Sequence, residues 1–515
     1  MKWAHFLHIY QPADQHPGIL EKIVNESYRP LLRGFFKIPE TKVTLNVSAV
    51  LSELLFKNGY RDVIEDIKAL VEMKRLELTS SAKYHAFLPL LPESEVRRQI
   101  ELNDETNSRY FGKAYRPKGF FSPEMAYNPK IASIVNNLCY KWILADEVAL
   151  TAQDKTIDYS TIYKISGMNL QVYFREKRPS NLIMGALIRS AESLKHTMED
   201  VFNRLGYVIT AMDGETFGHH RPGLENTLFS IMHSEDFQNV FVSDLSLYYK
   251  KTKEVKPLDS TWASSVEDVR NGNSYDLWFD KTNKIHEYEW QLASLATESV
   301  NNSWYSDKCY PKLLEESTDW NELTEKQKIE EQKKRQWVKV RDALDKALNS
   351  DPWWWASAKP WWSVESIEKG MNALFKVVIS VPDASQDSKD QAEELYKNIL
   401  FTAHEWQRKG MVDQMAQTDS ESRRIPLSKR LGATVYYKAL LKALKLQEEK
   451  ASKNREYEQA IKWRDSQYKL ERDLDIYDAV HVMDLFRSEG DFEKFNDILK
   501  EYRQKYREIS KGQPE

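Results

Sequence analysis

Short apolar runs recur through the first 250 residues of the chain, and polar segments with a helical period separate several of them. The runs are rich in β-branched and aromatic residues, which is typical of buried strands. The strand candidates are residues 3–9, 43–48, 75–80, 118–123, 141–146, 169–174, 206–213 and 239–244.

The segments between these runs predict helices. Residues 49–74 and 93–110 place apolar side chains at helical spacing over most of their length. Strands that alternate with helices favour a parallel sheet or barrel over a sandwich. We therefore expect an α/β fold built on a complete or distorted (β/α) barrel.

The pattern changes after about residue 255, where helical periods replace the short apolar runs. Residues 324–348 are densely charged, which is typical of a helix with a solvated face. Residues 433–489 contain no Gly or Pro, so they predict two or more long helices. We expect residues 382–390 to be a loop and residues 511–515 to be a disordered tail. The predicted domains are a barrel at 1–260, a helical region at 261–380 and a C-terminal helical region at 381–515.

Composition narrows the classes of partner. A chain of 515 residues with 41% hydrophobic residues, 30% charged residues and a net charge of −4 gives no reason to expect nucleic acid or an anionic membrane as a partner. Cys139 and Cys309 stand 170 positions apart (309 − 139), which argues against a disulfide framework or a cysteine zinc site. His5 and His8 break the first apolar stretch, and no apolar run reaches the roughly 18–20 residues of a membrane helix. We expect a cytoplasmic protein, and the sequence leaves its oligomeric state open.

Acidic, histidine and amide side chains follow four of the predicted strands. They are His8, Tyr10 and Gln11 at the first strand, His85 after the third, Glu124 after the fourth, and Asp213, Glu215 and His219 in the segment AMDGETFGHH (211–220). Active sites of parallel α/β sheets and barrels form where the carboxyl ends of the strands meet. We therefore expect these side chains to share one rim.

Each of these residues also has a purely structural explanation. His8 could be a hydrogen-bonded core histidine, and His85 could serve packing. Glu124 could cap the helix that begins near Asn128, and Asp213 could cap a helix or form the turn before Gly214. Four separate strands delivering such groups to the same end of one sheet favours a functional site.

Two carboxylates on different strands suit glycoside hydrolysis. In that reaction one carboxyl acts as acid and base, and the other as nucleophile or base. The nearby His, Tyr and Gln groups suit the hydroxyls of a sugar ring, and the aromatic residues suit its apolar faces.

These residues resemble the motifs of glycoside hydrolase family 57. The first motif, His-x-His-Gln-Pro, is similar to HIYQP (8–12), with Tyr10 where the second histidine is expected. The second is similar to RLELTSSAKYHAFLPLL (75–91). GFFSPEMAY resembles the third, with Ser122-Pro123 replacing the usual Leu and small residue, and DGETFGHH resembles the fourth. The fifth, rich in tryptophan, is similar to NSDPWWWASAKPWW (349–362).

The resemblance implies a distorted (β/α)7-type barrel followed by a mainly helical region. It implies a retaining mechanism on α-glucans, without a cofactor or a metal, by a hydrolase or a 4-α-glucanotransferase. It makes Glu124 the nucleophile and Asp213 the acid and base. The residues expected to bind substrate are His8, Tyr10, Gln11, His85, Glu215, His219, Asp351 and Trp354.

Two alternatives stay open. A metal-dependent polysaccharide deacetylase would need Asp-Asp near the start of the chain and a His-x3-His pair, and the sequence contains no His-x3-His. His219 and His220 are adjacent, which is poor spacing for joint ligation of a metal. A noncatalytic glucan-binding protein is the second alternative, favoured by Tyr10 and disfavoured by the presence of both carboxylates.

Overall fold

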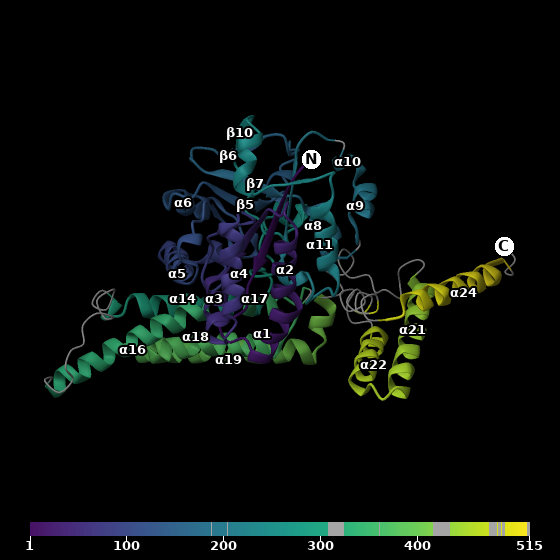
Figure 1. The fold of residues 1–515 in the computed structure, drawn as a ribbon. Helices are drawn as coiled ribbons and strands as arrows, with labels where there is room; N and C mark the ends of the chain where they lie inside the picture. The colour runs from purple at the N-terminus through teal and green to yellow at the C-terminus, as the bar shows by residue number, and fades with distance from the viewer. Residues whose placement is uncertain are drawn as a thin grey trace.

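A computed structural model describes residues 1–186, 188–202, 204–306, 324–359, 361–415, 433–472, 482, 486 and 490–511. Figure 1 shows a strand-containing body above a layer of long helices, with the C-terminal helices standing to one side. Cys309 and residues 512–515, on which two of the expectations above fall, lie outside the described residues.

Parallel strands form a distorted barrel. Its strands are β1 (Lys2–Ile9), β2 (Val43–Val47), β3 (Leu76–Thr79), β4 (Gly119–Phe120), β5 (Trp142–Asp146), β7 (Gln171–Arg175) and β8 (Tyr207–Asp213). One sheet runs β3-β2-β1-β8, and the other carries β7-β5-β4. A bridge between Ser80 and Phe120 joins β3 to β4, and the Glu176 amide donates to the Ile209 carbonyl (2.8 Å) between β7 and β8. These two links close the ring, so the expected (β/α)7-type barrel is confirmed.

Amphipathic helices cover the barrel. They include α1 (Pro17–Ile23), α2 (Arg29–Lys37), α5 (Glu93–Phe111), α6 (Pro129–Asn137), α8 (Lys177–Met184), α9 (Ala191–Thr197), α10 (Glu199–Phe202) and α11 (Leu224–His233), and a π-helical turn, η1 (Val24–Tyr28), joins α1 to α2. The single helix expected at 49–74 is wrong: α3 (Ala49–Lys57) and α4 (Arg61–Glu72) flank Gly59, whose φ of 87° no other residue adopts easily.

Three further expectations need correction. The run at 239–244 contains only β9 (Gln238–Asn239) and the 3₁₀ turn η6 (Val242–Asp244). The strands β6 (Ile162–Ile165) and β10 (Thr252–Val255) lie outside the predicted runs. Three of the four residues of β10 are exposed, so it has no apolar run, and β6 is a short strand that runs antiparallel to β7. The loop expected at 382–390 ends at Ser385, whose side chain caps α19.

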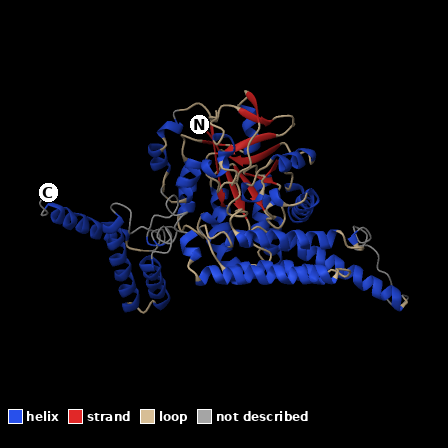
Figure 2. Cartoon of the chain, turned by 180° about the vertical axis from the view of Figure 1, so that it is seen from behind, coloured by secondary structure: helices blue, strands red, loops and turns tan. Residues whose placement is uncertain are grey.

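Long helices form a layer below the carboxyl ends of the barrel strands. They are α14 (Lys284–Asn301), α16 (Glu325–Ala347), α18 (Val364–Ser380) and α19 (Gln386–Arg408), with the short α17 (Asp351–Trp355) between α18 and the barrel. Figure 2 shows the same layer from behind, with all strands confined to the body above it. The remaining long helices are α21 (Ala433–Lys453), α22 (Tyr457–Arg472) and α24 (Phe492–Lys511). Short elements are α7 (Val148–Thr151), α12 (Leu245–Tyr248), α13 (Val266–Arg270), η2 (Leu88–Leu90) and η3 (Gly112–Ala114).

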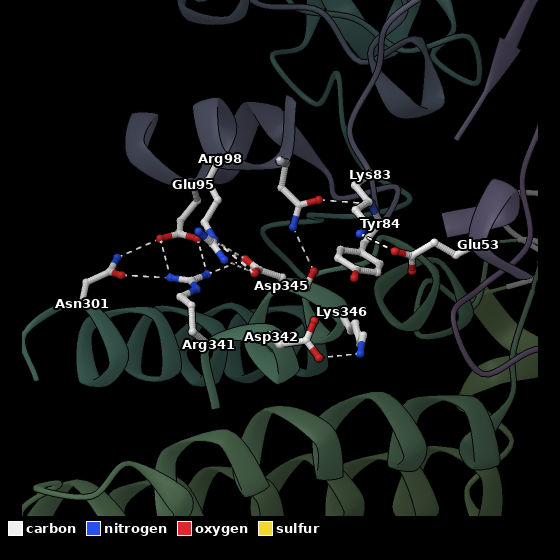
Figure 3. Close-up of polar contacts among 11 residues, drawn as sticks. Glu53, Lys83, Tyr84, Glu95, Arg98, Asn301, Arg341, Asp342, Asp345 and Lys346 are labelled. Carbon is white, nitrogen blue, oxygen red and sulfur yellow. Dashed lines mark hydrogen bonds and ion pairs between the residues drawn. The ribbon is translucent and has the colours of Figure 1, made fainter. Parts of the chain in front are cut away.

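A buried network of charges fastens the helical layer to the barrel (Figure 3). Arg341 of α16 donates to Glu95 of α5 (2.6 Å) and to Asp345 (2.9 Å), and Arg98 of α5 donates to Asp345 (2.6 Å). Glu95, Arg341 and Asp345 are each at most 4% exposed. Since α16 leads directly into α17, this network fixes where α17 meets the rim of the barrel.

None of the helices in the described part of the chain has the length and apolarity needed to cross a membrane.

Candidate active site

Glu124 and Asp213 lie at the carboxyl ends of two barrel strands. Glu124 sits in the 3₁₀ turn η4 (Pro123–Met125) that follows β4, and Asp213 is the last residue of β8. Glu124 has a φ of 59° and Met125 a φ of 50°, a left-handed conformation that costs about 1–3 kcal/mol for such residues. The Trp262 amide donates to the Glu124 carbonyl (3.2 Å), which helps to hold this turn. The strained backbone is typical of a turn whose side chain must point in one direction.

The Glu124 carboxyl is half-buried and lies beside a tryptophan and a histidine. Trp262 donates its indole Nε1 to Glu124 Oε2 (2.9 Å), and His85 Nδ1 lies 3.9 Å from Oε1. Burial, and then the charges of Asp213 and Asp351, raises the pKa of Glu124 to about 8, whereas the Trp262 hydrogen bond lowers it. Glu124 caps no helix, because Asn128 itself caps α6. The cap explanation is therefore wrong for Glu124.

Asp213 lies close enough to Glu124 for its charge to raise the pKa of Glu124. No described residue donates a hydrogen bond to its carboxyl, and its side chain does not cap the 3₁₀ turn η5 (Gly214–Thr216) that follows. Burial, and then Glu215, raises the pKa of Asp213 to about 7, while Arg175 lowers it. A half-buried carboxyl without a donor favours the protonated form, which a general acid needs.

Glu215 follows Asp213 by two residues, and its carboxylate binds residues just after β1 and at the end of η1. It accepts hydrogen bonds from the Tyr10 amide (3.2 Å), Gln11 Nε2 (3.2 Å) and the Tyr28 hydroxyl. Glu215 is 4% exposed and Gln11 is 7% exposed. These contacts join the β1 and β8 ends of the barrel, so both residues hold the rim together.

His219 lies on the same loop and pairs with Glu26 of η1, with Nδ1 2.7 Å from Oε2. Its part in substrate binding stays a prediction.

His8 and His85 form one directed chain of hydrogen bonds. Asn46 donates Nδ2 to Thr79 Oγ1 (3.1 Å), so its Oδ1 accepts from His8 Nδ1 (2.8 Å). The second nitrogen of His8 must then accept from His85 Nε2 (3.0 Å), and His85 Nδ1 accepts from the Ser350 hydroxyl (2.9 Å). Burial lowers the pKa of His8 to about 4 and that of His85 well below its usual value. Both rings are therefore neutral, and the chain ties the barrel rim to the start of α17.

Tyr10 replaces a histidine of the expected motif and makes two contacts that a smaller residue would lose. Its ring stacks on His85 at 4.1 Å between centroids, and its hydroxyl donates to Asp351 Oδ2 (3.1 Å). Burial raises the pKa of Asp351 to about 6, although the Tyr10 hydrogen bond lowers it. Asp351 therefore joins Glu124 and Asp213 as a third acid of the site.

The five tryptophans of residues 351–362 differ in exposure: one is fully buried, and the other four are partly exposed. Trp353 is fully buried and stacks on Trp290 of α14 (4.5 Å), as a residue that joins helices would. Trp354 is partly exposed, contacts Trp361 (5.2 Å) and lies one helical turn after Asp351. Its place at the substrate groove stays a prediction.

Residue patterns missed several parts of this site. Asn46, Trp262 and Ser350 have no local signal, because each acts through a residue distant in sequence. Asp146 and Arg175 end β5 and β7, and both are buried and hydrogen-bonded to each other (2.9 Å). The rule that located the other rim residues could have found this pair, because both follow predicted strands.

Among the described residues, no group of three or more His, Cys, Asp and Glu side chains is placed to hold a metal ion.

Comparison with known proteins identifies the barrel. The profile described as "Glycosyl hydrolase family 57" matches residues 4–251. Over these residues the chain is similar to glycosyl hydrolase family 57. The matched segment carries both Glu124 and Asp213.

Relatives found by sequence match this chain only in part. An α-amylase of Pyrococcus horikoshii is 23% identical over 260 residues, which are 49% of this chain and 40% of that protein. A 4-α-glucanotransferase of Thermococcus litoralis is 25% identical over 141 residues, which are 27% of this chain and 21% of that protein. The matches thus span about a fifth to two fifths of these relatives.

The likeness in fold extends beyond the segment that the profile matches. A branching enzyme of this family from Thermococcus kodakaraensis superposes with a TM-score of 0.58 at 15% identity, covering 76% of this chain and 94% of the other. At this identity the likeness concerns the fold alone. It includes part of the helical region, because 76% of the chain is more than the roughly half of its 515 residues that residues 1–260 make up.

Proposed function

We propose that this protein is a retaining glycosidase or transglycosylase that acts on α-glucans, with Glu124 as nucleophile and Asp213 as acid and base. One observation carries the proposal: in a barrel similar to family 57, Glu124 and Asp213 stand at the carboxyl ends of separate strands, close enough for the charge of Asp213 to raise the pKa of Glu124. Glu124 has an indole donor, and Asp213 has no donor among the described residues. This difference suits one ionised and one protonated carboxyl.

The pair would work in two steps. Glu124 attacks the anomeric carbon while Asp213 donates its proton to the departing oxygen, which leaves a covalent glycosyl-enzyme. Asp213 then takes a proton from water or from a sugar hydroxyl, which attacks the same carbon and restores the original configuration. The productive form holds one proton on the pair, and that proton is on Asp213. Burial raises the pKa of Glu124 to about 8, above the value of about 7 for Asp213, so this form is the less populated one in the free protein. The Trp262 hydrogen bond favours it by stabilising the negative charge on Glu124.

Asp351, Tyr10 and Trp354 belong to the same proposal as residues that bind the sugar. They come from a rim loop and from α17, so the substrate groove would lie between the barrel and the helical layer. The domain limits at 260 and 380 are part of this proposal. So is a cytoplasmic location, which the free thiol of Cys139 suits.

Incubation with maltoheptaose, followed by chromatography of the products, tests the proposal. Glucose and short oligomers alone indicate hydrolysis, and oligomers longer than the substrate indicate transfer. Binding without any turnover would instead support a noncatalytic glucan-binding protein. Activity on acetylated polysaccharide that EDTA abolishes would support a deacetylase.

A further inference from the structure

A second group of charges lies at the same rim, and two of its three members are buried. Asp146 ends β5 and is 0% exposed, and Arg175 ends β7 and is 2% exposed. Arg175 Nη1 donates to Asp146 Oδ2 (2.9 Å), and Lys177 Nζ lies 3.8 Å from Asp146 Oδ1. The steps proposed above use none of these three residues.

The two cations of this group each hold one backbone carbonyl beside the proposed catalytic pair. Arg175 Nε donates to the Ala211 carbonyl (2.8 Å), two residues before Asp213 on β8. Lys177 Nζ donates to the Ser264 carbonyl, two residues after Trp262, whose indole donates to Glu124. Asp146 therefore contacts two cations. Arg175 binds the strand that carries Asp213, and Lys177 binds the segment that carries Trp262, the donor to Glu124.

We propose that Asp146, Arg175 and Lys177 are positioning residues that together set the separation between the carboxyl groups of Asp213 and Glu124. The inference rests on the function proposed above and deepens it. Retaining enzymes need roughly 5–5.5 Å between the two carboxyls, and inverting enzymes roughly 6.5–9.5 Å, so a shift of about 1 Å changes the chemistry.

Stability alone does not explain why charges occupy these positions. Burying an ion pair costs desolvation energy, and apolar residues of similar volume often stabilise a protein as well or better. A guanidinium, however, reaches several acceptors in fixed directions, and Arg175 binds Asp146, Ala211 and Asn181 at 2.8–2.9 Å. This geometry fixes β7 against both β5 and β8.

Arg175 also carries positive charge toward Asp213. The other groups that act on Asp213 are Glu215 and Glu124, which are acidic, and Tyr28, whose hydroxyl binds Glu215. Burial and Glu215 raise the pKa of Asp213, and Arg175 opposes them. Arg175→Lys keeps this charge and loses the forked geometry, whereas Arg175→Met loses both.

Kinetics on maltoheptaose across pH separate these effects. Arg175→Lys is expected to lower kcat about tenfold to a hundredfold and to leave KM unchanged. The decline of kcat/KM at high pH, the basic limb of the profile, should stay at the pH of the wild type. Arg175→Met is expected to lower kcat similarly and to move the basic limb upward by about one pH unit. Asp146→Asn, which leaves the two cations without their shared anion, is expected to lower kcat as well.

Arg341→Lys is the matched control, because Arg341 is also a buried arginine with several acceptors, two of which are the carboxylates of Glu95 and Asp345. It is expected to lower Tm without moving the basic limb. If Arg175→Lys and Arg175→Met lower only Tm, with kcat and the pH profile of the wild type, the three residues are structural and the inference is overturned.

Crystal structures keep the inference testable if the wild type turns over no glucan. In that case the proposed function fails, but the separation between the Asp213 and Glu124 carboxyls can still be measured in the wild type and in Arg175→Met. An increase of about 1 Å or more supports the positioning role. An unchanged separation overturns it.

Discussion

At the scale of single residues, the proposed role of Asp213 as acid predicts that its loss slows some substrates much more than others. Asp213→Ala is expected to lower kcat on maltoheptaose by about 10²–10⁴-fold, because the departing sugar then leaves without a proton. Aryl glucosides with good leaving groups need little proton donation, so their first step is expected to remain near the wild-type rate. Stopped-flow release of the aryl group measures that step. Equal losses on both substrates would contradict an acid role for Asp213.

The raised pKa values of Glu124 and Asp213 predict how stability depends on pH. Glu124 titrates near 8 in the folded protein and near 4.5 in the unfolded chain, so the folded state holds the proton more tightly. Glu124 therefore destabilises the fold progressively as pH rises from about 4.5 to about 8, and costs nothing at lower pH. Glu124→Gln is expected to raise Tm by about 2 °C or more at pH 8.5 and to leave it unchanged at pH 4. A gain of equal size at both pH values would contradict the shift.

At the scale of elements, buried ion pairs join α5 to α16 and so link the barrel to the helical layer. Arg341→Met leaves Glu95 and Asp345 buried with fewer partners, and we expect it to lower the free energy of unfolding by about 3–5 kcal/mol. Arg97→Met, on the same helix α5, removes only an exposed pair with Glu93 and should cost less than about 1 kcal/mol. Urea unfolding of both variants checks the difference, and similar losses would contradict the buried network.

Elements with strong local patterns could be predicted from the sequence. The strands β1, β2, β5 and β8 match their apolar runs closely, because each is buried on both faces of the barrel wall. The split between α3 and α4 depends on the φ of Gly59, and the exposed strand β10 lacks an apolar run, so pattern alone missed both.

The residues of the site also divide into those that the sequence could locate and those that it could not. Glu124 and Asp213 could be located because parallel strands bring their carboxyl ends together. Trp262 and Ser350 could not, because their contacts with Glu124 and His85 span 138 and 265 positions.

At the scale of the whole molecule, the proposed groove is shared by regions far apart in the sequence. If Trp354 lines it, Trp354→Ala should raise KM for maltoheptaose about threefold to tenfold, the amount expected from losing one aromatic stacking contact. KM for a short aryl glucoside should change little. Trp304→Ala, at a tryptophan that is 65% exposed near the end of α14, is the control and should leave both values unchanged. Identical behaviour of the two variants would remove Trp354 from the groove.

The covalent intermediate on Glu124 is the centre of the proposal, and azide rescue of Glu124→Ala tests it most directly. On an aryl α-maltoside, the variant is expected to lose on the order of 10⁴-fold or more in kcat, because no glycosyl-enzyme can form. Added azide occupies the space of the lost carboxylate, restores part of the turnover and gives a glycosyl azide of inverted configuration. Wild-type turnover in Glu124→Ala, or a rescued product that keeps the α configuration, would contradict Glu124 as the nucleophile.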